Sequence, residues 1–275
     1  MNGMTYTLTY RIRNNQSHRE APRTVAVTAS PEQIAAFVET GYLVRPRVFT
    51  GASLQALRNI ADAIEARVLA TEKPQESAGF GGLFVRNIIN DEPQLETLIM
   101  ENPELISIAR AVLGPQVQLH ALVLRVAYPE LANQGVEWHF HQRVVPDPEP
   151  AFFARPVVVD HLIYLDDLTP DAGPLVVMPG SHKVNESLSS GDFSDKPGQV
   201  VVTCPAGSVV TAHSSLWHKA LAPTLAGGKR RLLVVGYSSI WIKPSDAPDK
   251  LRERVIANPN SSQERHELAG IRGHF

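Results

Sequence analysis

The sequence predicts a mainly β fold, a sandwich or jelly-roll barrel, with helices packed on one outer face. Helical periodicity dominates residues 30–113, whereas short strands separated by Pro, Gly, Asp and Ser clusters dominate from residue 116 onward. The chain has 275 residues, 43% of them hydrophobic, which is enough for one sizeable core. We therefore expect one domain over residues 30–248, flanked by a polar segment 1–29 and a C-terminal tail 249–275.

The first 29 residues are polar and basic. Weak alternation from Thr5 to Ile12 is compatible with an edge strand, and we expect the rest of this segment to be disordered. It lacks the apolar stretch of a signal peptide. Cys204 is the only cysteine, so no internal disulfide can form, and we expect a reducing, cytoplasmic setting.

Helix signals are clear between residues 30 and 113. Ser30 is a good N-cap, Pro31 suits the first helical position, and Gly41 can end this first helix before a short strand at 42–44. A longer amphipathic helix is expected at 51–70, with an apolar stripe formed by Leu54, Leu57, Ile60, Ala61, Ile64 and Val68. Residues 76–82 read as loop, and two shorter helices follow at 94–100 and 103–113.

The strands come later. Alternating or β-branched runs predict them at residues 117–127, 157–164, 174–178, 200–203, 208–212 and 231–238. The tail 249–275 is polar and partly helical in pattern, and could close over the domain as an arm.

Two histidines in a strand-like context are the most informative feature of the sequence. His139 and His141 are two residues apart, so along a strand both would point to one face. A third imidazole, His218, follows Trp217 far downstream. Imidazole binds Fe, Zn, Cu and Ni well, and three rings from two strands would leave coordination positions open for substrate and oxygen. A pair of core histidines is the alternative; the remaining histidines considered, His18, His120, His266 and His274, are interpreted as ordinary surface or core residues.

Charged residues inside apolar strands need partners. Arg125 lies in the run Leu122–Val126, and a buried anionic ligand would satisfy it. Arg230 and Arg231 open the last strand; alternation sends one into the barrel and the other outward, and the inner one could clamp a carboxylate. Asp160 could pair with Arg125 or accept a hydrogen bond from a ligating imidazole.

From about Pro31 to Lys243 the chain resembles the phytanoyl-CoA dioxygenase family of iron(II)- and 2-oxoglutarate-dependent oxygenases. Five stretches carry the resemblance through their order and spacing: Glu137–Gln142, Tyr164–Asp167, Gly173–His182, Ala206–Val210 with Leu216–His218, and Arg230–Tyr237. The resemblance implies a double-stranded β-helix, the cupin-like jelly roll, with supporting N-terminal helices.

The resemblance also implies residue roles. The first metal histidine of the family falls on His139 and the distal one on His218. The arginine that binds 2-oxoglutarate falls on Arg230, with Arg231 as a close second, and a basic residue that helps to hold the co-substrate falls on Arg125. Fe(II), 2-oxoglutarate and O2 are the implied cofactors, and a small molecule would be oxidised, most simply by hydroxylation. Pro179–His182 reads as a structural turn, so His182 is not expected to be a ligand.

The chain departs from the family pattern at one ligand. The pattern is His-x-Asp…His, and His141 stands where the carboxylate should be. In one interpretation His141 ligates in a three-histidine site. In a second it turns away, and water, Glu137 or Asp160 completes the shell. In a third the site is weakened and no longer hydroxylates. A bulky histidine argues against the route of halogenating relatives, in which a small residue admits halide.

Two other functions compete with the oxygenase. One is a three-histidine iron dioxygenase that binds its substrate directly, without 2-oxoglutarate; the other is a non-catalytic metal- or ligand-binding relative. The net charge of −2 gives no reason to expect nucleic acid or an anionic membrane as a partner. Residues 147–154, with Phe152 and Phe153, form a candidate lid. Neither the substrate nor the oligomeric state follows from the sequence.

Overall fold

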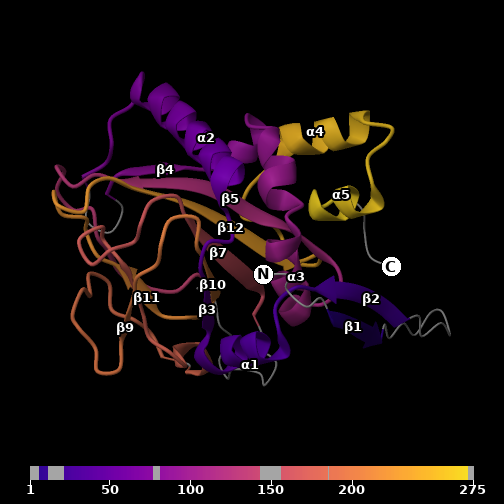
Figure 1. Cartoon of the computed structure of the whole chain (residues 1–275), viewed down its shortest axis with the longest axis horizontal. Coiled ribbons are helices and arrows are strands. Elements are labelled where there is room, and N and C mark those ends of the chain that lie inside the picture. Colours follow the sequence, from indigo (N-terminus) through magenta and orange to yellow (C-terminus); the bar gives the residue numbers. More distant parts are fainter. Residues whose placement is uncertain (1–5, 12–21, 77–80, 143–155, 185, 272–275) are drawn as a thin grey trace.

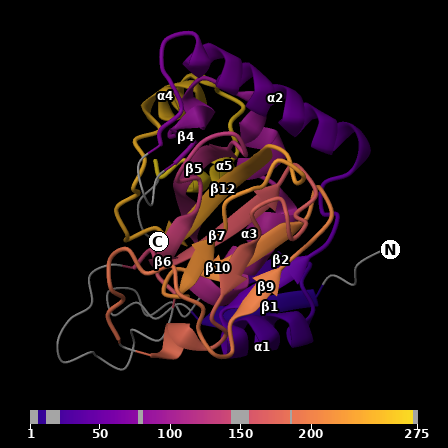
Figure 2. The same cartoon turned by 90° about the vertical axis from the view of Figure 1, so that its left-hand side faces the viewer.

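Two antiparallel sheets, of six and four strands, form the main β part of the fold. The computed structural model describes residues 6–11, 22–76, 81–142, 156–184 and 186–271. The larger sheet has the strand order β3-β10-β7-β12-β5-β4, and the smaller sheet has the order β6-β11-β8-β9. Figure 2 shows the larger sheet, with β7, β10 and β12 side by side.

The strands of the larger sheet are β3 (Tyr42–Arg45), β4 (Leu83–Val85), β5 (Val117–Ala127), β7 (Val158–Tyr164), β10 (Val209–His213) and β12 (Arg230–Ser239). Those of the smaller sheet are β6 (Val136–His139), β8 (Leu175–Val177), β9 (Val200–Val202) and β11 (His218–Ala220). The predicted strands are thus all present, within a few residues at their ends.

Helices cover the outer face of the larger sheet, as the sequence predicted. They are α1 (Pro31–Thr40), α2 (Gly51–Leu69), α3 (Pro103–Leu113), α4 (Asp249–Ala257) and α5 (Gln263–Leu268), and a π-helical turn spans Glu96–Met100. Figure 1 shows α2, α3, α4 and α5 gathered on one side of the strands. Leu57, Leu105, Leu251 and Leu268 of these helices join the same buried cluster as Leu233 of β12. The C-terminal segment therefore contributes to the main core.

The start of α1 follows from its sequence. Ser30 accepts a hydrogen bond from the backbone N–H of Gln33, and the Gln33 side chain bonds back to the Ser30 N–H, which completes a capping box. Gly41 ends the helix with φ of 84°, in the left-handed region that favours glycine. An added Cβ there would also meet the His182 ring. A side chain at residue 41 is therefore disfavoured both by the backbone conformation and by this contact.

The sequence did not predict three of the strands, namely β2, β4 and β11. β1 (Tyr6–Arg11), expected as an edge strand, pairs with β2 (Pro22–Val27), which lies in the segment expected to be disordered. That expectation was wrong for β2, because Val25 and Val27 bury against Ile108 of α3, a contact that composition does not reveal. β4 and β11 have three residues each, too few for alternation to be recognised, and they lack the consecutive valines that mark the equally short β8 and β9.

Strict alternation along β12 separates an inner from an outer face. Leu233 and Val235 pack outward into the main core, whereas Leu232 and Val234 face the space between the two sheets. That space is a cavity of about 660 Å³, lined by both sheets. No helix in the described ranges combines the length and apolarity needed to cross a bilayer.

Candidate metal centre

Two neighbouring strands of the smaller sheet bring His139 and His218 together. β6 ends at His139 and β11 begins at His218, and the two residues are register partners in the antiparallel ladder. Their ring centroids lie 4.1 Å apart. Residues separated by about eighty positions in the sequence thus become adjacent through strand pairing alone.

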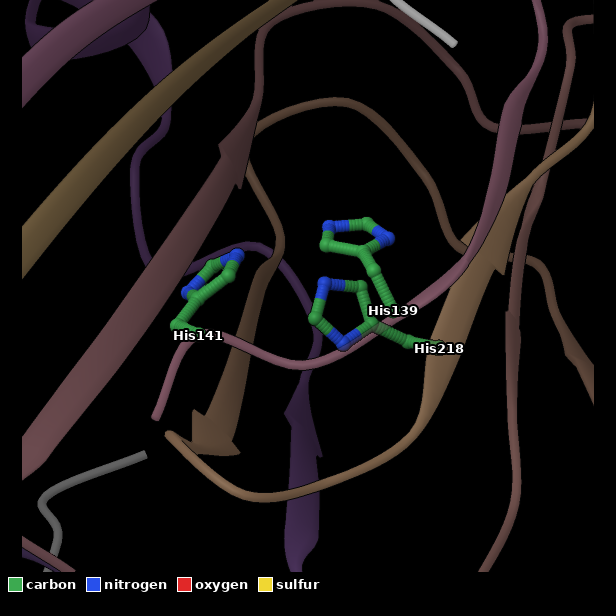
Figure 3. A group of neighbouring side chains, drawn as sticks. All are labelled: His139, His141 and His218. Atoms are coloured by element: carbon green, nitrogen blue, oxygen red, sulfur yellow. The ribbon is translucent and has the colours of Figure 1, made fainter. Parts of the chain in front are cut away.

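His141 completes the group from outside the strand. Because β6 ends at His139, strand alternation does not orient His141, and that part of the sequence argument was wrong. The segment is fixed instead by two hydrogen bonds, in which the N–H groups of His141 and Gln142 donate to the Ser214 carbonyl at 2.8 and 2.9 Å. The His141 ring then lies 5.4 Å from that of His139 and 4.9 Å from that of His218, and the three rings converge (Figure 3).

The three rings offer a compact set of nitrogen donors. One ligand atom from each lies within 4.8 Å of the corresponding atoms of the other two. His218 is buried, His139 is half-buried and His141 is exposed, so the set is open on the side of His141. Burial first, and then the neighbouring His139 and His141, hold the pKa of His218 well below its ordinary value. A neutral imidazole is the form that binds a metal.

Each ring is oriented by an acceptor at its Nδ1 atom. Nδ1 of His139 lies 2.8 Å from the Glu137 carbonyl, Nδ1 of His218 lies 2.8 Å from the Leu216 carbonyl, and Nδ1 of His141 lies 2.7 Å from Oδ2 of Asp160. An acceptor at Nδ1 selects the tautomer with the proton there, so each ring carries its lone pair on Nε2. This donor set suits iron(II), whose borderline character matches imidazole.

The side chains that might have replaced His141 are used elsewhere. The Glu137 carboxylate accepts a short hydrogen bond from the Gly191 N–H, and Asp160 accepts from the His141 ring. Asp160 does not pair with Arg125, which was the other possibility left open by the sequence; the Arg125 guanidinium lies over the Phe84 ring and donates weakly to the Gly81 carbonyl.

Two arginines line the same cavity as the histidines. Arg230 is 5% exposed, and its Nη1 donates to the carbonyls of Gly173 and Leu221. Burial lowers the pKa of Arg230; burial and then the proximity of Arg230 lower the pKa of Arg125 to about 10. Within the described part of the chain, neither arginine forms an ion pair. Two desolvated cations side by side favour an anionic ligand.

Arg231 lies on the opposite face of β12. Its guanidinium pairs with Asp166 and Asp62, both at 2.6 Å. These bonds raise the pKa of Arg231 above its ordinary value, with the Asp166 hydrogen bond as the main cause. Of the two candidates for the cavity arginine, the structure therefore places Arg230 there.

His120, which sequence reasoning passed over, also lines this cavity. The pairing of β12 with β5 advances from Gly236↔Ala121 to Tyr237↔Leu119, so His120 is an extra, bulged residue. Its carbonyl accepts from the N–H groups of Ser245 and Asp246, and its Nδ1 is buried with no hydrogen-bond partner among the described residues. Burial is the main cause that lowers the pKa of His120. A bulge depends on cross-strand pairing, so no local signal marks it.

The other sequence-based candidates lie apart. His182 follows a turn at Gly180 and bonds the Val38 carbonyl, and its ring is tilted against that of His213, with the centroids 4.8 Å apart. It is not one of the three converging histidines. The candidate lid at residues 147–154 lies outside the described residues.

Comparison with known proteins identifies the family of the chain. Residues 37–231 match the profile of the phytanoyl-CoA dioxygenase (PhyH) family. An uncharacterised protein of Mycobacterium tuberculosis is 29% identical over 197 residues, 70% of this chain and 69% of that protein. The L-proline trans-4-hydroxylase of Streptomyces griseoviridis is 23% identical over 235 residues, 74% of this chain and 85% of that enzyme.

The fold agrees with the sequence match. HygX of Streptomyces hygroscopicus, solved with nickel and 2-oxoglutarate bound, superposes with a TM-score of 0.64 at 19% identity, over 78% of this chain and 89% of that one. The predicted jelly roll is confirmed. The family match also favours the oxygenase over the direct-binding dioxygenase and the non-catalytic module. With the family profile matched along most of its length, the chain belongs to the phytanoyl-CoA dioxygenase family.

Proposed function

We propose that this chain oxidises a small molecule with Fe(II), 2-oxoglutarate and O2, and that His139, His141 and His218 hold the iron. One observation carries the assignment of roles: three imidazoles with a common tautomer and two cations without an ion pair among the described residues line one cavity. The family supplies the class of reaction, and the geometry supplies the residues.

The arginine end of the cavity fits the co-substrate. In this proposal Arg230 binds the distal carboxylate of 2-oxoglutarate, and Arg125 adds a second positive charge. The Gly173 and Leu221 carbonyls fix the Arg230 guanidinium in the folded protein, so little rotational freedom is lost on binding. Tyr164 lies in the same wall, and burial raises the pKa of its phenol, which stays a neutral hydrogen-bonding group.

Apolar side chains line part of the remaining wall. Leu162, Leu175, Leu232 and Val234 line the cavity, and Leu162, Leu175 and Leu232 also belong to a buried apolar cluster. Apolar walls strengthen the electrostatic contacts beside them. When bound together, iron, 2-oxoglutarate and O2 supply the oxidising chemistry, with succinate and CO2 as co-products. The protein contributes three oriented donors, a preformed anion clamp and a sheltered volume.

An anaerobic titration tests the proposal. Fe(II) is added to the metal-free protein, then 2-oxoglutarate, and the weak visible charge-transfer band of iron-chelated 2-oxoglutarate is recorded. We expect the band in the wild type and its loss in His218→Ala. Iron binding without a band, together with O2 uptake that does not depend on 2-oxoglutarate, would contradict the proposal and favour direct substrate binding.

A further inference from the structure

His141 removes one negative charge from the metal site of the family pattern, and a carboxylate lies beside its ring. Relative to the His-x-Asp…His pattern, a neutral imidazole replaces an anion, so a divalent metal in this site would lose one negative ligand. Oδ2 of Asp160 lies 2.7 Å from Nδ1 of His141, on the side of the ring away from Nε2. A carboxylate is thus present near this position, but it contacts the His141 ring rather than the metal site directly.

This contact distinguishes His141 from the other two histidines. His139 and His218 donate to the neutral backbone carbonyls of Glu137 and Leu216. Among the contacts between described residues, the charged acceptor, Asp160, lies at the histidine that stands where the family pattern has its carboxylate. The structure therefore adds negative charge at the one ligand where the sequence removed it.

Asp160 occupies a place that the sheet leaves open for it. It is 6% exposed and lies on β7, on the face that also carries Leu162 and Tyr164 into the cavity. Its register partner on β12 is Gly236, where a Cβ would lie 2.9 Å from Oδ1 of Asp160. Among the described residues, His141 is the only basic side chain bonded to this carboxylate. A buried anion without a Lys or Arg partner costs stability, so its retention favours a role at the metal.

We propose that Asp160 is the displaced carboxylate of the metal centre. It holds His141 with Nε2 toward the metal and, through the ring, supplies the negative charge that a directly bound aspartate would provide. Asp160 is a positioning residue in this inference, which rests on the proposed function. Outer-shell carboxylates that accept from a ligating imidazole fix its orientation and raise its basicity.

Cobalt(II) alone is the probe for the first test, because its visible absorption reports coordination geometry without turnover. We expect Asp160→Asn to weaken Co(II) binding by about 10- to 100-fold and to change the absorption spectrum. The matched control is Glu96→Gln, which removes a carboxylate that is 7% exposed and is paired with Arg254 on the outer face. The control should keep the wild-type affinity and spectrum even where its melting temperature falls. Wild-type binding and spectrum in folded Asp160→Asn overturn the inference.

Two further variants keep the test decisive if Asp160→Asn folds poorly. Gly236→Ala crowds the carboxylate without changing any charge, and we expect it to weaken Co(II) binding as well. His141→Asp places a second carboxylate near Asp160, so the double variant His141→Asp/Asp160→Asn should bind Co(II) more tightly than His141→Asp alone. If Asp160→Asn weakens Co(II) binding by the same factor in the His141→Asp background as in the wild type, the inference is contradicted. If the folded wild type binds no Co(II) or Fe(II), the proposed function itself fails, which is a separate result.

Discussion

Arg230 and Arg231 are neighbours in the sequence and lie on opposite faces of β12. The Arg230 guanidinium bonds the Gly173 carbonyl inside the cavity, whereas that of Arg231 pairs with Asp62 and Asp166 outside it. The inner arginine has no acidic partner among the described residues, and the outer one has two. This difference makes the pair a natural test of the anion clamp.

Arg230→Gln should weaken 2-oxoglutarate binding by about 10- to 100-fold, because a hydrogen bond to a charged group contributes about 1.5–3 kcal/mol. Arg231→Gln is the control and should change this affinity by less than about threefold, with a stability loss of about 1 kcal/mol from its surface ion pairs. Titration of the charge-transfer band measures both variants. The opposite ranking would place the co-substrate elsewhere.

We expect the Arg125 side chain to lower the stability of the metal-free protein and to strengthen 2-oxoglutarate binding. Burial and the nearby Arg230 lower its pKa to about 10, which means that the folded protein disfavours its charge. We expect Arg125→Met to raise the melting temperature of the metal-free protein and to weaken 2-oxoglutarate binding. Calorimetry and the band titration measure the two effects. Arg254→Met, which breaks the Glu96 ion pair, should lower the melting temperature instead; a fall in Arg125→Met would show that the guanidinium stabilises the fold.

Single histidine replacements should separate the interpretations of the metal site. Loss of a direct ligand should weaken Fe(II) binding by more than about 100-fold, beyond the effect of an outer-shell partner. We expect this for His139→Ala, His141→Ala and His218→Ala, and wild-type affinity for His182→Ala, whose ring bonds the Val38 carbonyl. Retained affinity in His141→Ala alone would indicate that water or another group completes the shell.

His161 should make the metal-free protein sensitive to acid. It is fully buried on the outer face of β7, where its Nδ1 lies 2.8 Å from the Thr211 hydroxyl. Burial is the main cause that holds its pKa far below 6.5. The unfolded chain therefore binds this proton at a higher pH than the folded chain, and stability present above pH 6.5 is lost as the pH falls below it.

The size of this effect is about 1.4 kcal/mol per pH unit for one group. Urea unfolding between pH 7.5 and 5, in the presence of a chelator, should show a shallower pH dependence in His161→Gln than in the wild type. Equal slopes would mean that other groups, such as His182, account for the acid sensitivity.

Much of the fold follows from local rules. Ser30 and Gly41 bound α1 as their capping preferences predict, and the long strands β5, β7 and β12 are visible as apolar runs. The short strands β4 and β11 were missed, because three residues show no period and these two strands lack the consecutive valines of β8 and β9. β2 was missed because its burial against α3 is a tertiary contact.

The sequence by itself determined the jelly-roll family and its iron, 2-oxoglutarate and oxygen chemistry, because the order and spacing of its motifs are recorded along the chain. It also identified His139, His141 and His218 as candidates. Only the tertiary structure decided that Arg230 rather than Arg231 faces the cavity, that His120 is turned into it, and that Asp160 accepts from His141. The first two depend on how β12 pairs and on its register with β5, which is fixed by pairing between segments far apart in the sequence. The third depends on the hydrogen bonds that hold the His141 segment to the Ser214 carbonyl.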